Sequence, residues 1–157
     1  MSREDDILQA FAMKLGLPGL KFDASRVCQL TVEGLKLALY DNRTRKSVTI
    51  LCELADSSMS RGEVEDWQKF LFESQFQFLH KDTPVVGFNS ASGEMVAMNH
   101  IADDELSLSR LCAKLNELIE WVLEGSHQFS MRSRAAFIGL TSPTYQPANS
   151  LRRGHHA

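Results

Sequence analysis

The spacing of apolar residues changes after the first 25 positions, and this change limits the folds open to the chain. Leu8, Phe11 and Leu15 recur every three or four residues, as on one face of an α-helix. From Cys28 and Leu30 onward, apolar residues occupy every second position, which is typical of a strand with one buried face. The chain therefore combines helices with antiparallel strands, and we expect an α+β fold.

Residues at both ends of the first helical pattern mark its limits. Ser2 and Asp5 have the spacing of a capping box, in which each side chain bonds the backbone of the other residue. Gly16 and Pro18 follow the last apolar residue of the pattern and are typical of a helix end. The sequence predicts a helix between these signals.

Three strands are predicted after the helix. Glu33-Gly34 forms a tight turn between the first two, and residues 41–44 form a polar turn before the third. The core face of the third strand is predicted at Val48, Ile50, Cys52 and Leu54. The opposite face of the sheet should be polar, but it carries Ala38, Tyr40, Leu51 and Ala55. We therefore expect another body to cover that face.

A second helix begins at Ser60, where Ser60-Arg61-Gly62-Glu63 has the form of a capping box. At 100° per residue its apolar side chains fall on two sides of the helix, whereas a surface helix has one apolar stripe. One side carries Val64, Trp67, Leu71 and Phe78, and the other carries Phe72, Phe76 and Leu79. We expect the second side to contact another copy of the chain.

The remaining pattern predicts two strands and a third helix. Pro84 precedes the fourth strand, residues 90–93 form a hairpin loop, and residues 95–98 carry the return strand. Asp103 and Asp104 are predicted to open the third helix, and Gly125 to stop it. The predicted architecture is helix–three strands–helix–two strands–helix, with a twisted antiparallel sheet packed against helices in a homodimer. It forms a domain over 1–125, followed by a basic tail over 126–157 that is flexible or docked.

Charge is unevenly distributed along the chain. All 20 acidic residues lie in the first 125 positions, whereas the last 32 contain four arginines and no acid. Because phosphate binding requires a dense cationic surface, an acidic body argues against nucleic acid as the main partner.

Three cysteines, Cys28, Cys52 and Cys112, lie far apart within apolar patterns, as expected of buried free thiols in a reducing compartment. The acidic N-terminus is unlike a signal peptide, and no apolar run approaches the ~18 residues of a membrane span. We expect a cytoplasmic protein.

A search for reactive residues yields no enzyme signature. The histidines lack the i, i+3 or i, i+4 spacing of helical metal ligands, and no base accompanies Cys112. The acidic run 103–105 suits a helix N-terminus, and the glycine-containing loop 87–93 lacks the lysine of a phosphate-binding loop. We therefore expect no catalytic, cofactor-binding or metal-binding residues.

The order of elements and two local stretches resemble a known family. ILQAFAMKLGLP at 7–18, followed by Phe22-Asp23 and an alternating strand, is similar to the opening of the CesT/Tir-chaperone family of class I type III secretion chaperones. NELIEW at 116–121 is similar to its closing helix. The resemblance covers about residues 5–124, and most members end soon after the third helix.

This resemblance implies a homodimer that binds an extended N-terminal segment of a secreted effector and keeps it soluble and secretion-competent, without nucleotide. By the resemblance, the dimer interface would include Trp67, Phe70, Phe72, Phe76, Val85, Val86 and Phe88. The effector-binding groove would include Leu8, Phe11, Leu30, Leu37, Tyr40 and Leu51, although periodicity alone also allows these to be core residues.

Three alternatives remain open from the sequence. The chain also resembles the related-fold binding protein YbjN, which shares the helix–sheet–helix plan. It could instead be a regulator of the chaperone family that sequesters a control protein in place of an effector. A small enzyme is the third alternative, and a metal assay or a polar pocket would identify it.

Overall fold

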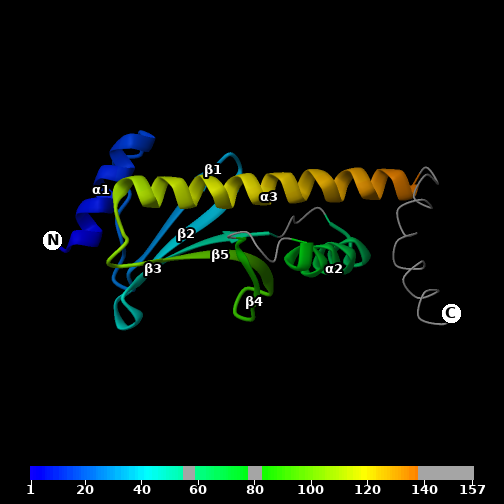
Figure 1. Cartoon of the computed structure of the whole chain (residues 1–157), viewed down its shortest axis with the longest axis horizontal. Coiled ribbons are helices and arrows are strands. Elements are labelled where there is room, and N and C mark those ends of the chain that lie inside the picture. Colours follow the sequence, from blue (N-terminus) through cyan, green and yellow to red (C-terminus); the bar gives the residue numbers. More distant parts are fainter. Residues whose placement is uncertain (55–58, 78–82, 138–157) are drawn as a thin grey trace. The chain divides into compact units, whose positions relative to one another are not determined.

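The computed structural model describes residues 1–54, 59–77 and 83–137, with the backbone alone at 76–77 and 135–137. Its elements follow the predicted order (Figure 1). They are α1 (Arg3–Leu15), β1 (Val27–Val32), β2 (Leu35–Asn42), a short 3₁₀ turn (Arg43–Arg45), β3 (Ser47–Glu53), α2 (Arg61–Gln77), β4 (Val85–Asn89), β5 (Glu94–Ala102) and α3 (Leu108–Phe137).

Helix α1 begins and ends where the sequence predicts. The Ser2 hydroxyl accepts a hydrogen bond from the Asp5 backbone N–H, and the Asp5 carboxylate accepts one from the Ser2 backbone N–H, which completes the capping box. Gly16 ends the helix at φ 69°, a left-handed conformation that glycine adopts without a Cβ clash. The buried residues of α1 are Leu8, Phe11 and Ala12.

All five strands form one antiparallel sheet in the order β1-β2-β3-β5-β4. The β1–β2 turn consists of Glu33 and Gly34, both at positive φ as a two-residue hairpin turn of this kind requires. The predicted core face of β3 is confirmed, since Val48, Ile50 and Cys52 are nearly inaccessible. Strand β5 is longer than predicted because it pairs with β3 as well as with β4.

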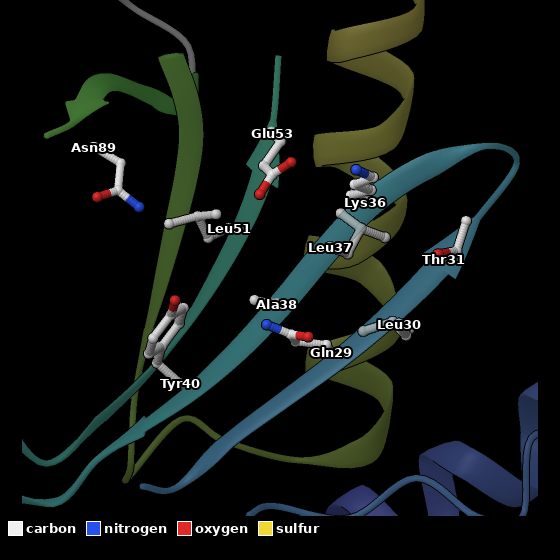
Figure 2. Close-up of a pocket in the computed structure, with 10 residues that line it drawn as sticks. All are labelled: Gln29, Leu30, Thr31, Lys36, Leu37, Ala38, Tyr40, Leu51, Glu53 and Asn89. Atoms are coloured by element: carbon white, nitrogen blue, oxygen red, sulfur yellow. The ribbon is translucent and has the colours of Figure 1, made fainter. Parts of the chain in front are cut away.

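The two faces of the sheet have different surroundings. One face carries Leu39 and Ile50, and α3 crosses it, where the Asn99 side chain donates to the Lys114 carbonyl at 3.5 Å. The register places Ala38, Tyr40 and Leu51 together on the opposite face, as the alternation predicts. We call this opposite side the outer face; Figure 2 shows it in front of α3. Ala55, predicted for the same face, lies outside the described residues.

The described part of helix α2 agrees with the first of its two predicted apolar sides. Trp67 and Leu71 are buried, and the Trp67 indole N–H donates to the Leu54 carbonyl at 2.9 Å. Phe72, on the other side, is 53% exposed. The predicted capping box is confirmed by the bonds between Ser60 and Glu63. Phe78 and Leu79 lie outside the described residues, as does the side chain of Phe76.

Both predicted limits of the third helix are wrong. Asp103 and Asp104 lie in a turn, and α3 begins at Leu108, where the Ser107 hydroxyl accepts from the Arg110 backbone N–H at 3.1 Å. A serine at the N-cap satisfies a free backbone N–H, which Asp103 and Asp104 lie too early to do. The helix continues through Gly125 to Phe137, since one interior glycine costs only about 1 kcal/mol relative to alanine.

The chain divides into two compact units, Met1–Val122 and Leu123–Ala157. The second unit begins with helical residues of α3, including the buried Phe129, and residues 138–157 of the predicted tail lie outside the described part. None of the helices in the described ranges combines the length and apolar character that crossing a membrane requires.

The three thiols should differ in reactivity. Burial raises the pKa of the Cys52 thiol to about 12 and also raises the pKa of the Cys28 thiol. Both side chains are almost inaccessible to solvent, whereas Cys112 is partly exposed. Because the thiolate is the reactive form, we expect one equivalent of thiol to react with Ellman's reagent in the native protein and three after denaturation. Protection of Cys112, or rapid labelling of Cys52 under native conditions, would contradict this expectation.

Candidate functional site

The outer face is hollowed over strands β1 to β3. The first hollow has a volume of about 470 Å³. Its lining combines an apolar part with a polar rim, and Figure 2 shows the side chains from all contributing strands. The apolar part includes Ala38, Tyr40 and Leu51, and the rim includes Gln29, Lys36 and Glu53.

The small side chain of Ala38 accounts for the position of this hollow. Ala38 lies in the middle of β2, opposite Gln29 of β1 and Leu51 of β3. Both neighbours are longer, so a methyl group between them leaves a depression. The first hollow thus has an apolar floor with larger side chains on both sides. This shape suits the insertion of a side chain from a partner.

A second hollow of about 370 Å³ adjoins the first toward β5. Tyr40 and Leu51 line both hollows. The second hollow adds Met98 together with Thr49 and His100, whose Oγ1 and Nδ1 atoms are 2.8 Å apart in a hydrogen bond. The outer face therefore offers two adjoining sites, and the lining of the second also includes Arg26 and Asp41.

Strand β1 forms an edge of the sheet next to the first hollow. Its sequence, VCQLTV, contains no charge and no proline, and all six residues pair with β2 without a bulge. Natural proteins usually protect sheet edges with charged residues, proline or bulges, because a bare edge can pair with another chain. The β1 edge is therefore suited to accept an added strand.

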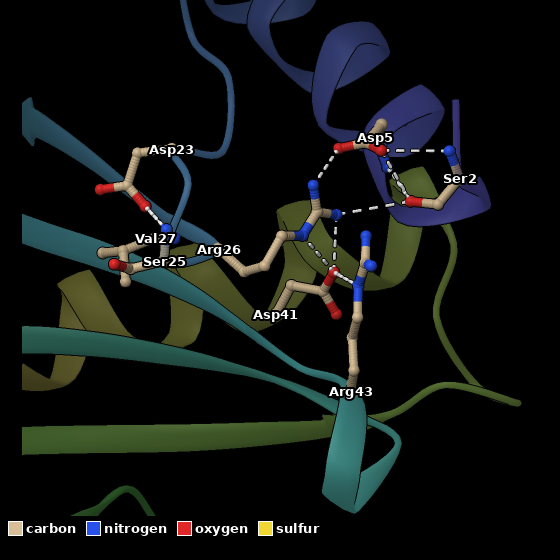
Figure 3. A network of polar contacts seen from close by, with 8 residues as sticks. All are labelled: Ser2, Asp5, Asp23, Ser25, Arg26, Val27, Asp41 and Arg43. Carbon is tan, nitrogen blue, oxygen red and sulfur yellow. Dashed lines mark hydrogen bonds and ion pairs between the residues drawn. The ribbon is translucent and has the colours of Figure 1, made fainter.

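An ion-pair network fixes the start of β1 against α1 and β2 (Figure 3). The Arg26 guanidinium donates to Asp5 at 2.8 Å and to Asp41 at 2.6 and 2.9 Å. Arg26 has a positive φ of 60°, and Asp23 stabilises the preceding turn by accepting bonds from the backbone N–H groups of Ser25 and Val27. The hydrogen bond from Arg26 lowers the pKa of Asp5 to about 2.

The periodicity of the sequence contained no signal for this network. The sequence predicts a polar turn at Asp41, yet its side chain is only 2% exposed and is paired with Arg26 and Arg43. The guanidinium of Arg26 also lies 4.6 Å from the ring centre of Phe22, in a cation–π contact. The Phe22-Asp23 pair quoted for the resemblance thus has a structural role at the entry to β1.

The residues predicted for effector binding fall into two groups in the structure. Tyr40 and Leu51 lie on the outer face and line both hollows. Leu30 and Leu37 are buried but reach the margin of the first hollow. The other two, Leu8 and Phe11, are 2% and 1% exposed in the chain's own core, which leaves little surface for a partner.

The residues predicted for the dimer interface also differ in exposure. Phe72, Val85 and Phe88 are more than half exposed, on α2 and on the β4 edge of the sheet. Val86 is half-buried. Trp67 is 3% exposed and stacks on the ring of Phe70 at 5.7 Å. The exposed members lie on α2 and on both faces of the β4 edge strand, and we call this region the α2–β4 surface: Phe72, Val85 and Phe88.

Metal ligands are not grouped in the part of the chain that the structure describes. Within it, no group of three or more His, Cys, Asp or Glu side chains could hold a metal ion. The hollows of the outer face are suited to binding, with an apolar floor and a polar rim.

Comparison with known families gives one match that covers most of the chain. The model of the Tir chaperone protein (CesT) family matches residues 6–123. No curated protein matches the chain significantly.

Solved structures confirm the fold. The HopA1–SchA chaperone–effector complex contains a chain that is 21% identical at a TM-score of 0.64, with 77% of this chain and 91% of that chain covered. The ExsC–ExsE complex contains one that is 19% identical at 0.61, covering 76% and 88%. The ExoT–SpcS complex from Pseudomonas aeruginosa contains one that is 18% identical at 0.55, covering 79% and 98%.

Proposed function

The chain belongs to the Tir chaperone protein (CesT) family of type III secretion chaperones, and we propose that its outer face holds an extended N-terminal segment of a secreted effector. The observation that carries the proposal is the pair of hollows next to the unprotected β1 edge. A segment there would stay unfolded and therefore secretion-competent. The family match favours this role over that of a YbjN-like binding protein.

Two kinds of contact support binding of an extended segment. Main-chain groups of the segment would pair with the β1 edge, as in other cases of strand addition. Side chains on one side of the segment would lie beside Gln29 and Thr31 and point toward the first hollow. Ordering a flexible segment costs conformational entropy, so apolar contact in these hollows is needed to offset it.

We further propose that the chaperone acts as a homodimer through the α2–β4 surface. This surface combines Phe72 of α2 with Val85 and Phe88 of the sheet edge. It also borders the outer face, because Asn89 of β4 lines the first hollow and Val85 pairs with Met98 of the second, so the dimer interface would lie next to the effector site. The proposed cytoplasmic location suits a chaperone that meets its effector before export.

Filling the first hollow tests the proposed binding site. Ala38→Leu places a larger side chain in the hollow, where space exists for it, and should weaken an effector segment at least about tenfold without unfolding the protein. Ala113→Leu is the matched control, because Ala113 is exposed on α3, on the other face of the sheet. The measurement is isothermal titration of N-terminal segments of candidate effectors that are co-expressed in soluble form with the chaperone.

Two outcomes would count against the proposal. Equal affinity of the wild type and Ala38→Leu for a bound effector segment would place the binding site elsewhere on the chain. Failure of every N-terminal effector segment from the same genome to form a complex would overturn the function itself.

A further inference from the structure

The backbone groups of β1 point alternately toward β2 and toward the free edge of the sheet. In an antiparallel pair, every second residue exchanges hydrogen bonds with the residue opposite, and the residues between them turn their N–H and C=O groups the other way. Residues 33–34 form a two-residue hairpin turn, so the flanking residues Val32 and Leu35 are a hydrogen-bonded pair. The even-numbered residues of β1 therefore bond β2, whereas its odd-numbered residues face the edge: Val27, Gln29 and Thr31.

Contacts at the start of β1 show the same alternation. The Arg26 carbonyl accepts a hydrogen bond from the Asp41 backbone N–H of β2 at 3.0 Å. The next residue, Val27, turns away from β2. Its N–H donates to the Asp23 carboxylate and its carbonyl accepts from the Asp23 backbone N–H, both at 2.9 Å. Asp23 therefore occupies both edge groups of Val27.

Gln29 and Thr31 are left with free backbone groups at the edge. Within residues 1–54, 59–77 and 83–137, no hydrogen bond reaches the outward N–H and C=O groups of these two residues. Their side chains are exposed on the outer face and line the first hollow (Figure 2). Leu30, between them, is buried and belongs to the face that α3 crosses. A partner strand can therefore form four hydrogen bonds here, two with each residue.

The free part of the edge has a limit at each end. Asp23 closes it at Val27, and the 33–34 turn closes it beyond Thr31. A strand displaced by two residues in either direction would lose two of the four hydrogen bonds. These limits fix the register of an added strand.

We propose that Gln29 and Thr31 pair with an antiparallel effector strand that carries polar side chains opposite them and an apolar side chain between, in a register limited by Asp23. The inference rests on the proposed function, because the ligand is the same extended segment. Every strand pair of this sheet is antiparallel, and antiparallel pairing is the more stable kind per residue.

The surroundings of the edge favour this pattern of side chains. Successive side chains of a strand point to opposite faces, so those opposite Gln29 and Thr31 lie on the outer face. The rim of the first hollow is polar there and includes Lys36 and Glu53. Hydrogen-bonding side chains such as threonine form favourable cross-strand pairs with such neighbours. The side chain between them would lie beside Leu30, where an apolar group suits the buried face.

An N-methyl scan of a probe peptide tests the pairing. The probe is acetyl-Thr-Val-Thr-Val-Thr-amide, whose threonines and valines face opposite sides of a strand. Methylation of an amide nitrogen removes its donor and blocks pairing on that side. Binding is followed by NMR at peptide concentrations up to the millimolar range. The amide signals of Gln29 and Thr31 should shift most, whereas those of Val27 and Leu30, which are already bonded, should shift little.

The wild type should distinguish the two kinds of methylated peptide. Methylation of the central threonine should weaken binding at least about tenfold, because that residue is paired in both registers that keep threonines on the outer face. Methylation of either valine should change the affinity by less than about threefold, since valine amides would point away from β1.

Two variants at one position separate the backbone from the side chain. Thr31→Pro removes the outward N–H and breaks no hydrogen bond to β2, so the protein should fold, as its amide NMR spectrum would show. It should bind the unmethylated probe at least about tenfold more weakly than the wild type. Thr31→Val is the matched control, because it keeps the N–H and the shape of the side chain, and its affinity should stay within about threefold.

The outcomes separate this inference from the proposed function. Unchanged affinity of Thr31→Pro, equal effects of both methylations, or no binding of the probe would overturn pairing through Gln29 and Thr31. Weaker binding of the valine-methylated peptides alone would overturn the antiparallel arrangement with threonines on the outer face. The proposed function fails only if effector segments are insensitive to Ala38→Leu or do not bind at all.

Discussion

Replacing Arg26 by methionine is expected to destabilise the domain by on the order of 3 kcal/mol, because the substitution leaves a buried carboxylate without its main partner. The Asp41 side chain is 2% exposed and accepts two hydrogen bonds from Arg26, at 2.6 and 2.9 Å. Methionine keeps most of the apolar stem but donates no hydrogen bond. Urea unfolding followed by circular dichroism measures the effect, which should appear as a lower midpoint at an unchanged slope.

Arg43→Met provides a matched control on the same carboxylate. Arg43 also contacts Asp41, but at 3.4 Å and with a side chain that is 62% exposed. An exposed ion pair of this kind contributes about 1 kcal/mol or less. If the two variants lost equal stability, the buried pair with Arg26 would not be the main interaction of Asp41.

The stability difference between Arg26→Met and the wild type should depend on pH. Arg26 lowers the folded-state pKa of Asp5 from 3.8 to about 2, so ionised Asp5 stabilises the fold fully only above about pH 4. As the pH falls from 4 to 2, the wild type loses this contribution, whereas the variant has less of it to lose, because only the hydrogen bonds with Ser2 still lower the pKa of Asp5 there. The difference between them should therefore narrow in this range, and a difference that widened would contradict the assignment.

Local signals in the sequence predicted the fold where neighbouring residues decide the structure. The capping box at Ser2, the helix end at Gly16 and the turn at Glu33-Gly34 each depend on a few adjacent residues. The alternation in β1 to β3 likewise assigned Ile50 to the core and Tyr40 to the outer face. The predicted end of α3 at Gly125 is wrong, because one interior glycine costs a helix only about 1 kcal/mol relative to alanine.

Features that depend on the pairing of distant strands could not be predicted from periodicity. The position of β5 between β3 and β4 joins segments more than forty residues apart, and it brings His100 beside Thr49. The first hollow likewise exists because the register sets Ala38 between two longer side chains. The burial of Asp41 cannot be predicted from periodicity either, because only the folded chain brings Arg26 beside it.

Phe72→Asp is expected to dissociate the proposed homodimer. Phe72 is 53% exposed in the single chain, so an aspartate there should be tolerated by a folded monomer. In a dimer through the α2–β4 surface, however, the carboxylate would be buried without a partner, at a cost of about 3–5 kcal/mol. Sedimentation equilibrium should give about 35 kDa for the wild type, twice the 17.7 kDa of the chain, and the mass of a monomer for the variant.

Phe88→Asp and Met13→Asp show whether dissociation is specific to this surface. Phe88 lies on β4 and is 59% exposed, so the proposal predicts the same dissociation as for Phe72→Asp. Met13 is 67% exposed on α1, outside the α2–β4 surface, and Met13→Asp should remain a dimer. Circular dichroism must show each variant folded, because an unfolded variant would report on stability alone. A monomeric wild type would contradict the homodimer itself. A Phe88→Asp variant that stays dimeric would show that β4 lies outside the interface. In either case the exposed side chains of β4 would be available to another partner.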